Sequence, residues 1–274
     1  MKQIYWIISG VFLAIGQINA QGIHGVIGAE AWMQGGVSST LSNVYAVVNN
    51  PSQISYLKKW QAGVYSEQRF NRKELTLANF SVAFPNRVVD VGVAVNYFGF
   101  QDFNQQRLVL SAAKKLAETF SLGVQLNYVA TNIKEYGTAG ALVLGAGVTY
   151  QPIKKVGVAL TIFNPTQQQL SNQVSDIIPA FARLGVKYTL SNKVYTTFEV
   201  DQQLEQKTVF RGGIRYELHK RVAVAIGVAN QPTLFTFGTS MLAGNLSIEA
   251  AATIHQTFGF TPQLGLRLPI QHKQ

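Results

Sequence analysis

The chain has 274 residues, of which 47% are hydrophobic and only 13% are charged, and its formal net charge is +10. Soluble domains carry about 25% charged residues, so roughly half of the usual charged surface is missing. The apolar content excludes intrinsic disorder, and the absence of cysteine excludes a disulfide scaffold, thiolate metal sites and cysteine nucleophiles. What remains is a poorly soluble globular protein or a protein whose outer surface faces lipid.

Residues 1–20 have the layout of a secretory signal peptide. Lys2 is their one basic residue, an apolar run extends from Ile4 to Ile15, and a short polar end closes on Ala20. We expect cleavage after Ala20, because the apolar run is short for a membrane anchor, which is the alternative. No later stretch approaches about 18 uninterrupted apolar residues, so we expect no transmembrane helix.

Residues 21–57 are rich in glycine and show no sustained strand period. The strands that follow predict a barrel with small inward-facing residues, so we expect this segment to fold into the lumen as a plug. A phosphate-binding glycine loop is the alternative, since Gly35 and Gly36 follow Gly25 and Gly28. That alternative lacks a preceding strand and a Walker lysine, and its spacing fits neither nucleotide-binding fingerprint.

From Trp60 onward the hydrophobic period is two. Around residue 95, for example, Val93, Val95 and Tyr97 share one face, and Ala94 and Asn96 share the other. Such alternation over about ten residues predicts strands with one apolar face. Fourteen segments follow this pattern, near residues 60–70, 75–85, 88–100, 105–115, 119–131, 140–151, 156–164, 180–190, 193–203, 208–217, 222–230, 233–243, 245–255 and 260–270.

The connections between these strands alternate in kind. Every second one is tight, as at residues 85–87 and 190–193, and the others are longer or more polar, as at 99–106, 131–140 and 164–180. Short periplasmic turns opposite longer outer loops are typical of bacterial outer-membrane barrels, which have an even number of strands. Both ends of the barrel chain then lie at the end with the turns.

The less polar strand faces consist of Val, Leu, Ile and Phe, with aromatic residues at the strand ends, such as Tyr97 and Tyr128 at one end and Tyr150 and Tyr188 at the other. Two aromatic belts indicate two membrane interfaces. A soluble β-sandwich would carry charge on its other face, which here is mostly Gly, Ala, Ser, Thr and Asn. We therefore expect an all-β fold, a 14-stranded antiparallel transmembrane β-barrel formed by residues 58–274.

Charged residues gather on the non-lipid face of three consecutive strands. We call them the charge ladder: Arg183, Lys187, Glu199, Asp201, Arg211 and Arg215. Folding about the intervening connections puts Arg183 opposite Glu199 and Asp201, and Glu199 opposite Arg211, and pairs of this kind contribute roughly 0.2 to 1 kcal/mol each.

The same arithmetic pairs Glu249 with Arg267 near the turns. We favour a structural role for the charge ladder, as salt bridges that let charge lie inside a barrel. The alternative is a polar lumen that guides a solute or grips a plug.

Ten of the 23 basic residues map to the end of the barrel with the tight turns. We call them the basic ring: Lys58, Lys59, Arg87, Lys114, Lys115, Lys154, Lys155, Lys193, Lys220 and Arg221. A positive ring on the periplasmic side would meet lipid phosphates or an acidic partner. Nucleic-acid binding would need an exposed aromatic platform among the lysines, and the sequence has none, so we expect no nucleic-acid partner.

Enzymatic functions have little support in the sequence. The four histidines, His24, His219, His255 and His272, lack metal-ligand spacing, and no nucleophile elbow occurs. The carboxyls of Glu199 and Asp201 are flanked by arginines that keep them ionised and so unsuited as general acids. We expect no catalytic residues, no metal and no cofactor.

The segment GAEAWMQGGVSSTLSNVYAVVNNPSQI resembles the N-terminal signature of FadL-like barrels and of the PorV/PorQ group found with type IX secretion. Residues 178–201 and 254–268 also resemble that group. In the signature, Glu30, Gln34, Asn43, Ser52 and Gln53 depart from the pattern. The matching positions, which we call the plug motif, are Gly28, Ala29, Gly35, Gly36, Asn50 and Pro51. The resemblance implies a fourteen-stranded barrel with an N-terminal plug.

From this resemblance we expect a non-enzymatic protein of the Gram-negative outer membrane that acts as an accessory or binding component in protein secretion or surface attachment. Its partners would be outer-membrane lipid and a secretion-machinery or cargo protein. The alternative is a FadL-like passive transporter of hydrophobic small molecules. A channel needs an apolar pocket beside the plug, whereas an export component needs an exposed docking face. The short predicted outer loops favour the accessory role.

Overall fold

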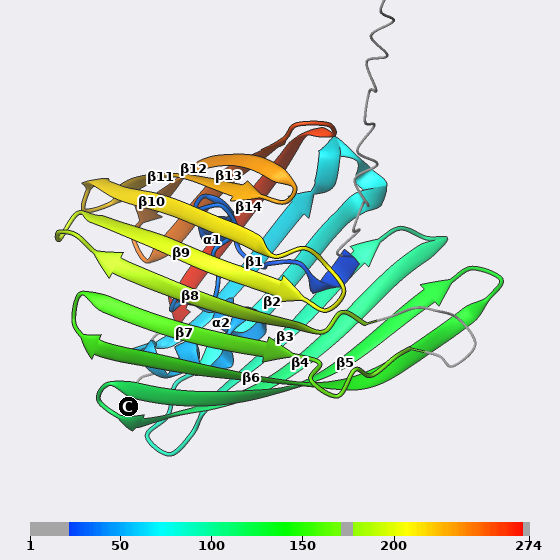
Figure 1. The fold of residues 1–274 in the computed structure, drawn as a ribbon, viewed down its shortest axis with the longest axis horizontal. Coiled ribbons are helices and arrows are strands. Elements are labelled where there is room, and N and C mark those ends of the chain that lie inside the picture. The colour runs from blue at the N-terminus through cyan, green and yellow to red at the C-terminus, as the bar shows by residue number, and fades with distance from the viewer. Residues whose placement is uncertain (1–21, 171–177, 271–274) are drawn as a thin grey trace, which may run out of the picture.

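The computed structural model describes residues 22–170 and 178–270 of the chain, and its strands close into a single ring (Figure 1). The expected fourteen strands and their antiparallel order are confirmed, with β1 pairing both β2 and β14. Closure leaves no free sheet edge among the described strands. The strands are β1 (Trp60–Gln68), β2 (Thr76–Phe84), β3 (Asp90–Gly99), β4 (Phe103–Ala117), β5 (Phe120–Ile133), β6 (Gly137–Ile153), β7 (Val156–Phe163), β8 (Phe181–Thr189), β9 (Val194–Gln203), β10 (Val209–His219), β11 (Val222–Asn230), β12 (Thr233–Ala243), β13 (Leu246–His255) and β14 (Gly259–Ile270).

The helices are short. Four lie in residues 22–57, which we call the N-terminal segment: η1 (Gly22–His24), α1 (Ala29–Trp32), α2 (Ala46–Asn49) and η2 (Pro51–Tyr56). Two more, η3 (Arg69–Asn71) and η4 (Lys73–Leu75), connect β1 to β2. No helix within the described residues is long and apolar enough to cross a membrane. The predicted signal peptide, residues 1–20, lies outside the described residues.

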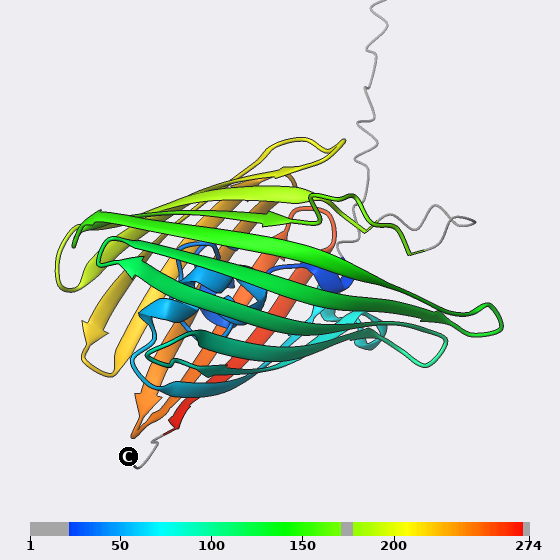
Figure 2. The ribbon, with the colours of Figure 1, turned by 90° about the horizontal axis from the view of Figure 1, so that it is seen from below.

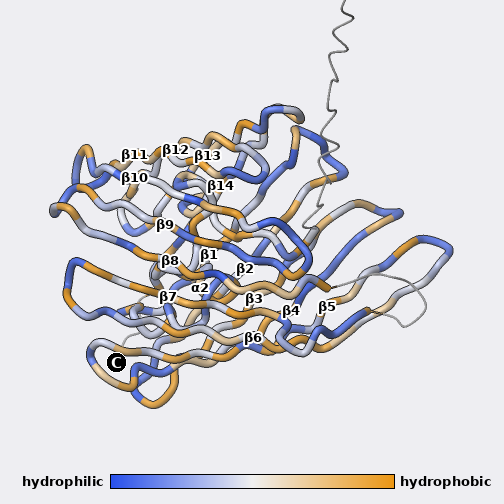
Figure 3. The backbone as a smooth tube through the Cα atoms, in the orientation of Figure 1, coloured by the Kyte–Doolittle hydropathy of each residue, from blue (hydrophilic) through white to orange (hydrophobic). Residues whose placement is uncertain are grey.

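Side chains alternate between the two faces of the wall, as the period of two predicts. On β3, Val95 and Tyr97 are 48% and 41% exposed, whereas Asn96 between them is fully buried. The hydropathy colouring shows hydrophobic residues recurring along the strands and hydrophilic ones concentrated in many connections (Figure 3). The outer face of the ring is therefore apolar, and small or polar side chains face inward.

Two of the expected loops belong to strands instead. β4, β5 and β6 have 15, 14 and 17 residues, so the connections expected at 99–106 and 131–140 shrink to residues 100–102 and 134–136. Their polar residues continue the hydrogen-bonded ladder, with Asn104 opposite Asn132. The β5–β6 hairpin consequently projects beyond its neighbours (Figure 2). Of the expected connection at 164–180, residues 171–177 lie outside the described part.

The barrel has two unlike ends. One, the turn end, holds the start of β1, the end of β14 and the tight β2–β3, β4–β5, β6–β7, β8–β9, β10–β11 and β12–β13 connections. The other, the loop end, holds the remaining connections. Lys114 and Lys115, expected in a turn, belong to β4 because that strand continues to Ala117.

The N-terminal segment lies inside the ring of strands (Figures 1 and 2). It begins near the loop end, where the backbone N–H of Ile23 donates to the Gln105 side chain over 3.1 Å, and leads into β1 at the turn end. Its apolar side chains, among them Ile27, Met33 and Val47, are fully buried. The hydrophobic core of the molecule thus lies between this segment and the inner faces of the strands.

Candidate functional site

The plug-motif residues shape the N-terminal segment. Gly28 precedes α1, which starts at Ala29, and Gly35 and Gly36 follow it with positive φ of 77° and 81°. A Cβ at Gly35 would collide with backbone oxygens of β10 and β11, so only glycine allows this approach to the wall.

Asn50 and Pro51 start η2, the last helix of the segment. The Asn50 side chain accepts a hydrogen bond from the Ser52 backbone N–H, and Pro51 occupies the first helical position. The Ser52 hydroxyl then lies 2.7 Å from the Thr149 hydroxyl on β6, and both side chains are buried. This contact fixes the turn-end part of the segment against the wall.

Glu30 is the only Asp, Glu, Lys or Arg residue of the N-terminal segment, and it lies in a cluster of ion pairs. Its carboxylate lies 2.9 Å from an Arg267 guanidinium nitrogen and 3.7 Å from one of Arg215. The Asn43 amide and the Tyr195 hydroxyl also donate to it, over 3.1 and 3.3 Å. Glu30 therefore links α1 to β9, β10 and β14.

Burial alone would raise the pKa of a carboxyl such as Glu30. Here the positive charges of Arg267 and Arg215 outweigh burial and lower the pKa of Glu30 to about 2. Glu30 is therefore ionised at any physiological pH, and the link between α1 and the wall persists.

The strand register places Arg183 opposite Asp201 and Glu199 opposite Arg211, as expected, but the ion pairs of the charge ladder converge on Asp201. Asp201 lies opposite Arg183, and its carboxylate lies 3.0 Å from the guanidiniums of both Arg183 and Arg211. Glu199 lies opposite Arg211 but accepts the backbone N–H groups of Ser38 and Ser39 instead, over 3.0 and 2.8 Å. A carboxylate held by backbone donors of the N-terminal segment anchors that segment to β9.

The other members of the ladder lie nearer the turn end. Lys187 places its amine 4.0 Å from the ring centroid of Tyr195, and Arg215 donates to the Ser240 hydroxyl over 2.7 Å. Arg267 forms an ion pair with Glu249, the partner expected for it, although register places Ser247 opposite Arg267. Glu30 also shares Arg215 and Arg267, a contact that was not predicted from the sequence.

The ten residues of the basic ring all lie at the turn end. Lys58 and Lys59 precede β1, Lys114 and Lys115 end β4, and the remaining six lie in the β2–β3, β6–β7, β8–β9 and β10–β11 turns. Arg87, Lys114 and Lys115 line a cavity of about 320 Å³ together with Ser55 and Asp90. A second cavity of about 280 Å³ lies near Arg215 and Arg267. Both cavities are lined by charged residues, so neither is the apolar pocket that a hydrophobic channel would hold beside its plug.

Apolar and aromatic residues gather instead at the loop end of the lumen. The rings of Phe163 and Phe181 stack with centroids 5.1 Å apart, the Arg107 guanidinium lies 4.6 Å from the Phe163 centroid, and that of Arg183 lies 4.1 Å from the Phe181 centroid. We call these four residues the loop-end aromatic cluster. His24 lies beside it, 5.6 Å from Phe163.

His24 is buried, and burial together with the neighbouring Arg107 and Arg69 lowers its pKa to about 3. It is therefore neutral at physiological pH. Arg107 was missed by the sequence analysis, although it lies at an inward position of β4, donates to Asn127 over 2.9 Å and is only 2% exposed. Following the period of two along β4 would have identified it, because Arg107, Val109 and Ser111 share the inward face.

No group of three or more His, Cys, Asp or Glu residues within the described part of the chain could hold a metal ion. The described histidines lie apart: His24 in the N-terminal segment, His219 at the end of β10 and His255 at the end of β13.

No protein-family model matches the sequence, and no curated protein matches it. Solved structures match its fold. A FadL homologue of Pseudomonas aeruginosa superposes with a TM-score of 0.67 at 11% identity, over 88% of this chain and 98% of the other. The CymD monoaromatic hydrocarbon channel gives 0.65 at 14% identity, over 93% and 100%. The toluene transporter TodX of Pseudomonas putida gives 0.61 at 11% identity, over 92% and 100%. The chain thus has the fold of these outer-membrane barrels along nearly its whole length.

Proposed function

We propose that this chain is an outer-membrane β-barrel that passes hydrophobic small molecules, with the N-terminal segment as its plug. The observation that carries the proposal is the likeness of fold, over nearly the whole of each chain, to structures described as a hydrocarbon channel and a toluene transporter. This was the alternative in the sequence analysis. The accessory role in type IX secretion has no support in these structures.

Insertion in the outer membrane is part of the proposal. Exposed Leu, Val, Ile and Phe side chains recur along the outer face of the ring, as at Leu110, Leu126 and Leu144, and lipid would cover them. The basic ring then faces the periplasm, and its lysines and arginines meet lipid phosphates there. The signal peptide expected over residues 1–20 would direct export.

In this proposal a solute enters at the loop end of the lumen and leaves at the turn end. The loop-end aromatic cluster is packed, with Phe163 1% and Arg107 2% exposed, so an entering solute would meet its apolar and π surfaces only when these rings move. Below it the lumen is occupied by the N-terminal segment, whose residues from Ile23 to Ile27 are buried. A solute therefore passes only when part of the N-terminal segment shifts, and the anchors at Glu30, Ser38, Ser39 and Ser52 limit that shift.

Uptake into vesicles tests the proposal. Lipopolysaccharide-containing vesicles are suitable, because a lipopolysaccharide leaflet resists hydrophobic compounds that cross a phospholipid bilayer unaided. With the purified protein inserted, we expect toluene to enter faster than into protein-free vesicles, while a sugar of similar size enters no faster. Equal rates of toluene entry with and without the protein would contradict the channel.

A further inference from the structure

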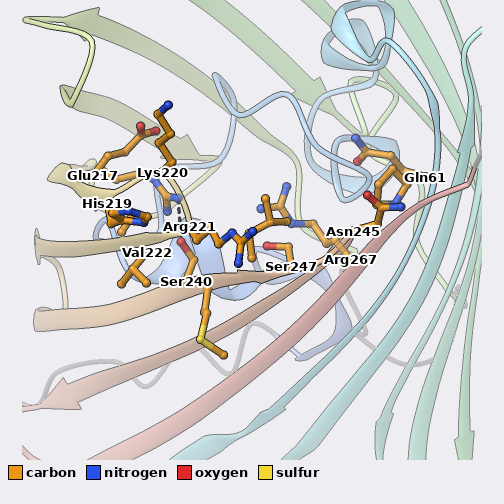
Figure 4. Close-up of a pocket in the computed structure, with 15 residues that line it drawn as sticks. Gln61, Glu217, His219, Lys220, Arg221, Val222, Ser240, Asn245, Ser247 and Arg267 are labelled. Carbon is orange, nitrogen blue, oxygen red and sulfur yellow. Dashed lines mark hydrogen bonds between the residues drawn. The ribbon is translucent and has the colours of Figure 1, made fainter.

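The cavity of about 280 Å³ lies at the turn end of the barrel, where it is lined by the turn-end parts of β10 to β14 and of β1 (Figure 4). Inward-facing residues of separate strands line it, including Arg215 of β10, Ser240 of β12 and Arg267 of β14. Lys220 and Arg221 reach it from the β10–β11 turn, and Gln61 of β1 lies on the opposite side. It is large enough for a small solute with several waters, since each water takes roughly 30 Å³ of liquid.

Positive charge dominates the lining. The lining contains one acidic residue, Glu217, and four residues with cationic side chains, Arg215, Lys220, Arg221 and Arg267. The carboxylates that pair with Arg215 and Arg267, those of Glu30 and Glu249, lie outside the lining. The surface that a solute would meet is therefore cationic.

Arg215 also has hydrogen-bonding capacity to spare. Its Nη2 donates to the Ser240 hydroxyl. Its Nη1 is buried and makes no hydrogen bond within the described residues, because the Glu30 carboxylate oxygen that it pairs with is 3.7 Å away, too far for a hydrogen bond. A buried donor without an acceptor is destabilising, so an oxyanion that reached Nη1 in place of the distant Glu30 carboxylate would be favoured. A guanidinium fork matches the paired oxygens of carboxylates and phosphates.

We propose that this cavity is a binding site for a small oxyanion, the carboxylate or phosphate group of a soluble molecule at the turn end. The site goes beyond passage of hydrophobic solutes and does not depend on it. The anion accepts from Arg215, with Lys220 and Arg221 adding attraction from the turn. Because Glu30 shares Arg215, the bound anion and the carboxylate of the N-terminal segment compete for one guanidinium.

Calorimetric titration of the full chain in detergent tests the site, with inorganic phosphate and propionate as separate probes. The variant K220Q/R221Q removes two charges from the cavity lining, where both residues are exposed. The control K154Q/K155Q removes two charges from the β6–β7 turn, at the same end but outside this lining. Neither double variant touches the ion pairs of Glu30.

We expect one saturable site for at least one probe, with affinity lowered several-fold in K220Q/R221Q and unchanged in K154Q/K155Q. Saturation with phosphate alone would assign the site to phosphate groups, and saturation with propionate alone to carboxylates. The variant R215K, which keeps the charge and loses the fork, should also bind more weakly. No saturable binding of either probe, or an equal loss in both double variants, would overturn the site.

Discussion

Glu30 shows how a single residue ties the N-terminal segment to the barrel. In a segment with no other acidic or basic residue except His24, its carboxylate reaches two arginines on separate strands. A charge that is buried without a partner of opposite sign destabilises a fold. A single glutamate in a segment expected to be buried therefore requires a basic partner on the barrel strands. The arginines that pair with Glu30 could not be predicted, because Arg215 and Arg267 lie far from it in the sequence.

The variant E30Q tests this tie. Glutamine keeps the size and the acceptor oxygen but removes the negative charge that lies beside Arg215 and Arg267. We therefore expect the free energy that holds the N-terminal segment in the lumen to fall by about 3 kcal/mol. Hydrogen exchange of the α1 amides should become roughly a hundredfold faster. The exposed Glu118 in the β4–β5 turn provides the control E118Q, for which we expect no change.

The pH dependence has a definite sign. Since the pKa of Glu30 is lowered from 4.5 to about 2, its contribution is fully present above about pH 4.5 and is lost as the pH falls toward 2. The difference in exchange between wild type and E30Q should therefore stay constant from pH 7 to pH 5 and vanish near pH 2. A difference that closes already near pH 6 would contradict the ion pairs.

Among the elements, the strands were predictable and the local structure of the N-terminal segment was not. Alternation in β3, β5 or β11 depends only on local sequence, because one face meets the lumen and the other does not. The starts of β4 and β6 were placed too late and the end of β5 too early, since polar residues near the loop end of a long strand look like a loop. The helices α1 and α2 have four residues each, too few for a helical period to show.

The path of the N-terminal segment depends on small residues in the wall, which a glycine substitution tests. A Cβ at Gly227 of β11 would collide with the backbone of Gln34 and Gly35, so G227A should break the hydrogen bond from the Gly35 N–H to Thr236. Overpacking of this kind costs about 1 to 3 kcal/mol, and limited proteolysis of the segment should accelerate.

Gly157 of β7 supplies the matched control, because the nearest atom to an added Cβ there is 3.8 Å away, on the Gln151 side chain. We expect G157A to be cleaved like the wild type. Equal cleavage of G227A and G157A would show that the segment does not rest on β11 as described.

At the scale of the whole molecule, the shortage of charge follows from the two faces of the wall. The outer face is apolar, the inner face is mostly small and uncharged, and the basic ring gathers at one end. Composition and periodicity thus predicted the closed barrel. They did not decide between transport and secretion, because Arg107, Phe163 and Phe181 come from three strands and meet only in the folded chain.

In the proposed function, hydrophobic solutes pass through the lumen and past the N-terminal segment. The Ser52 and Thr149 hydroxyls lie 2.7 Å apart and the chain has no cysteine, so S52C/T149C can introduce a single disulfide between this segment and β6. The most direct measurement is toluene uptake by lipopolysaccharide-containing vesicles that hold this variant, oxidised and then reduced, beside the single variant S52C. We predict uptake that is several-fold slower when oxidised and that returns to the S52C rate on reduction. Equal uptake before and after reduction would contradict passage past the N-terminal segment.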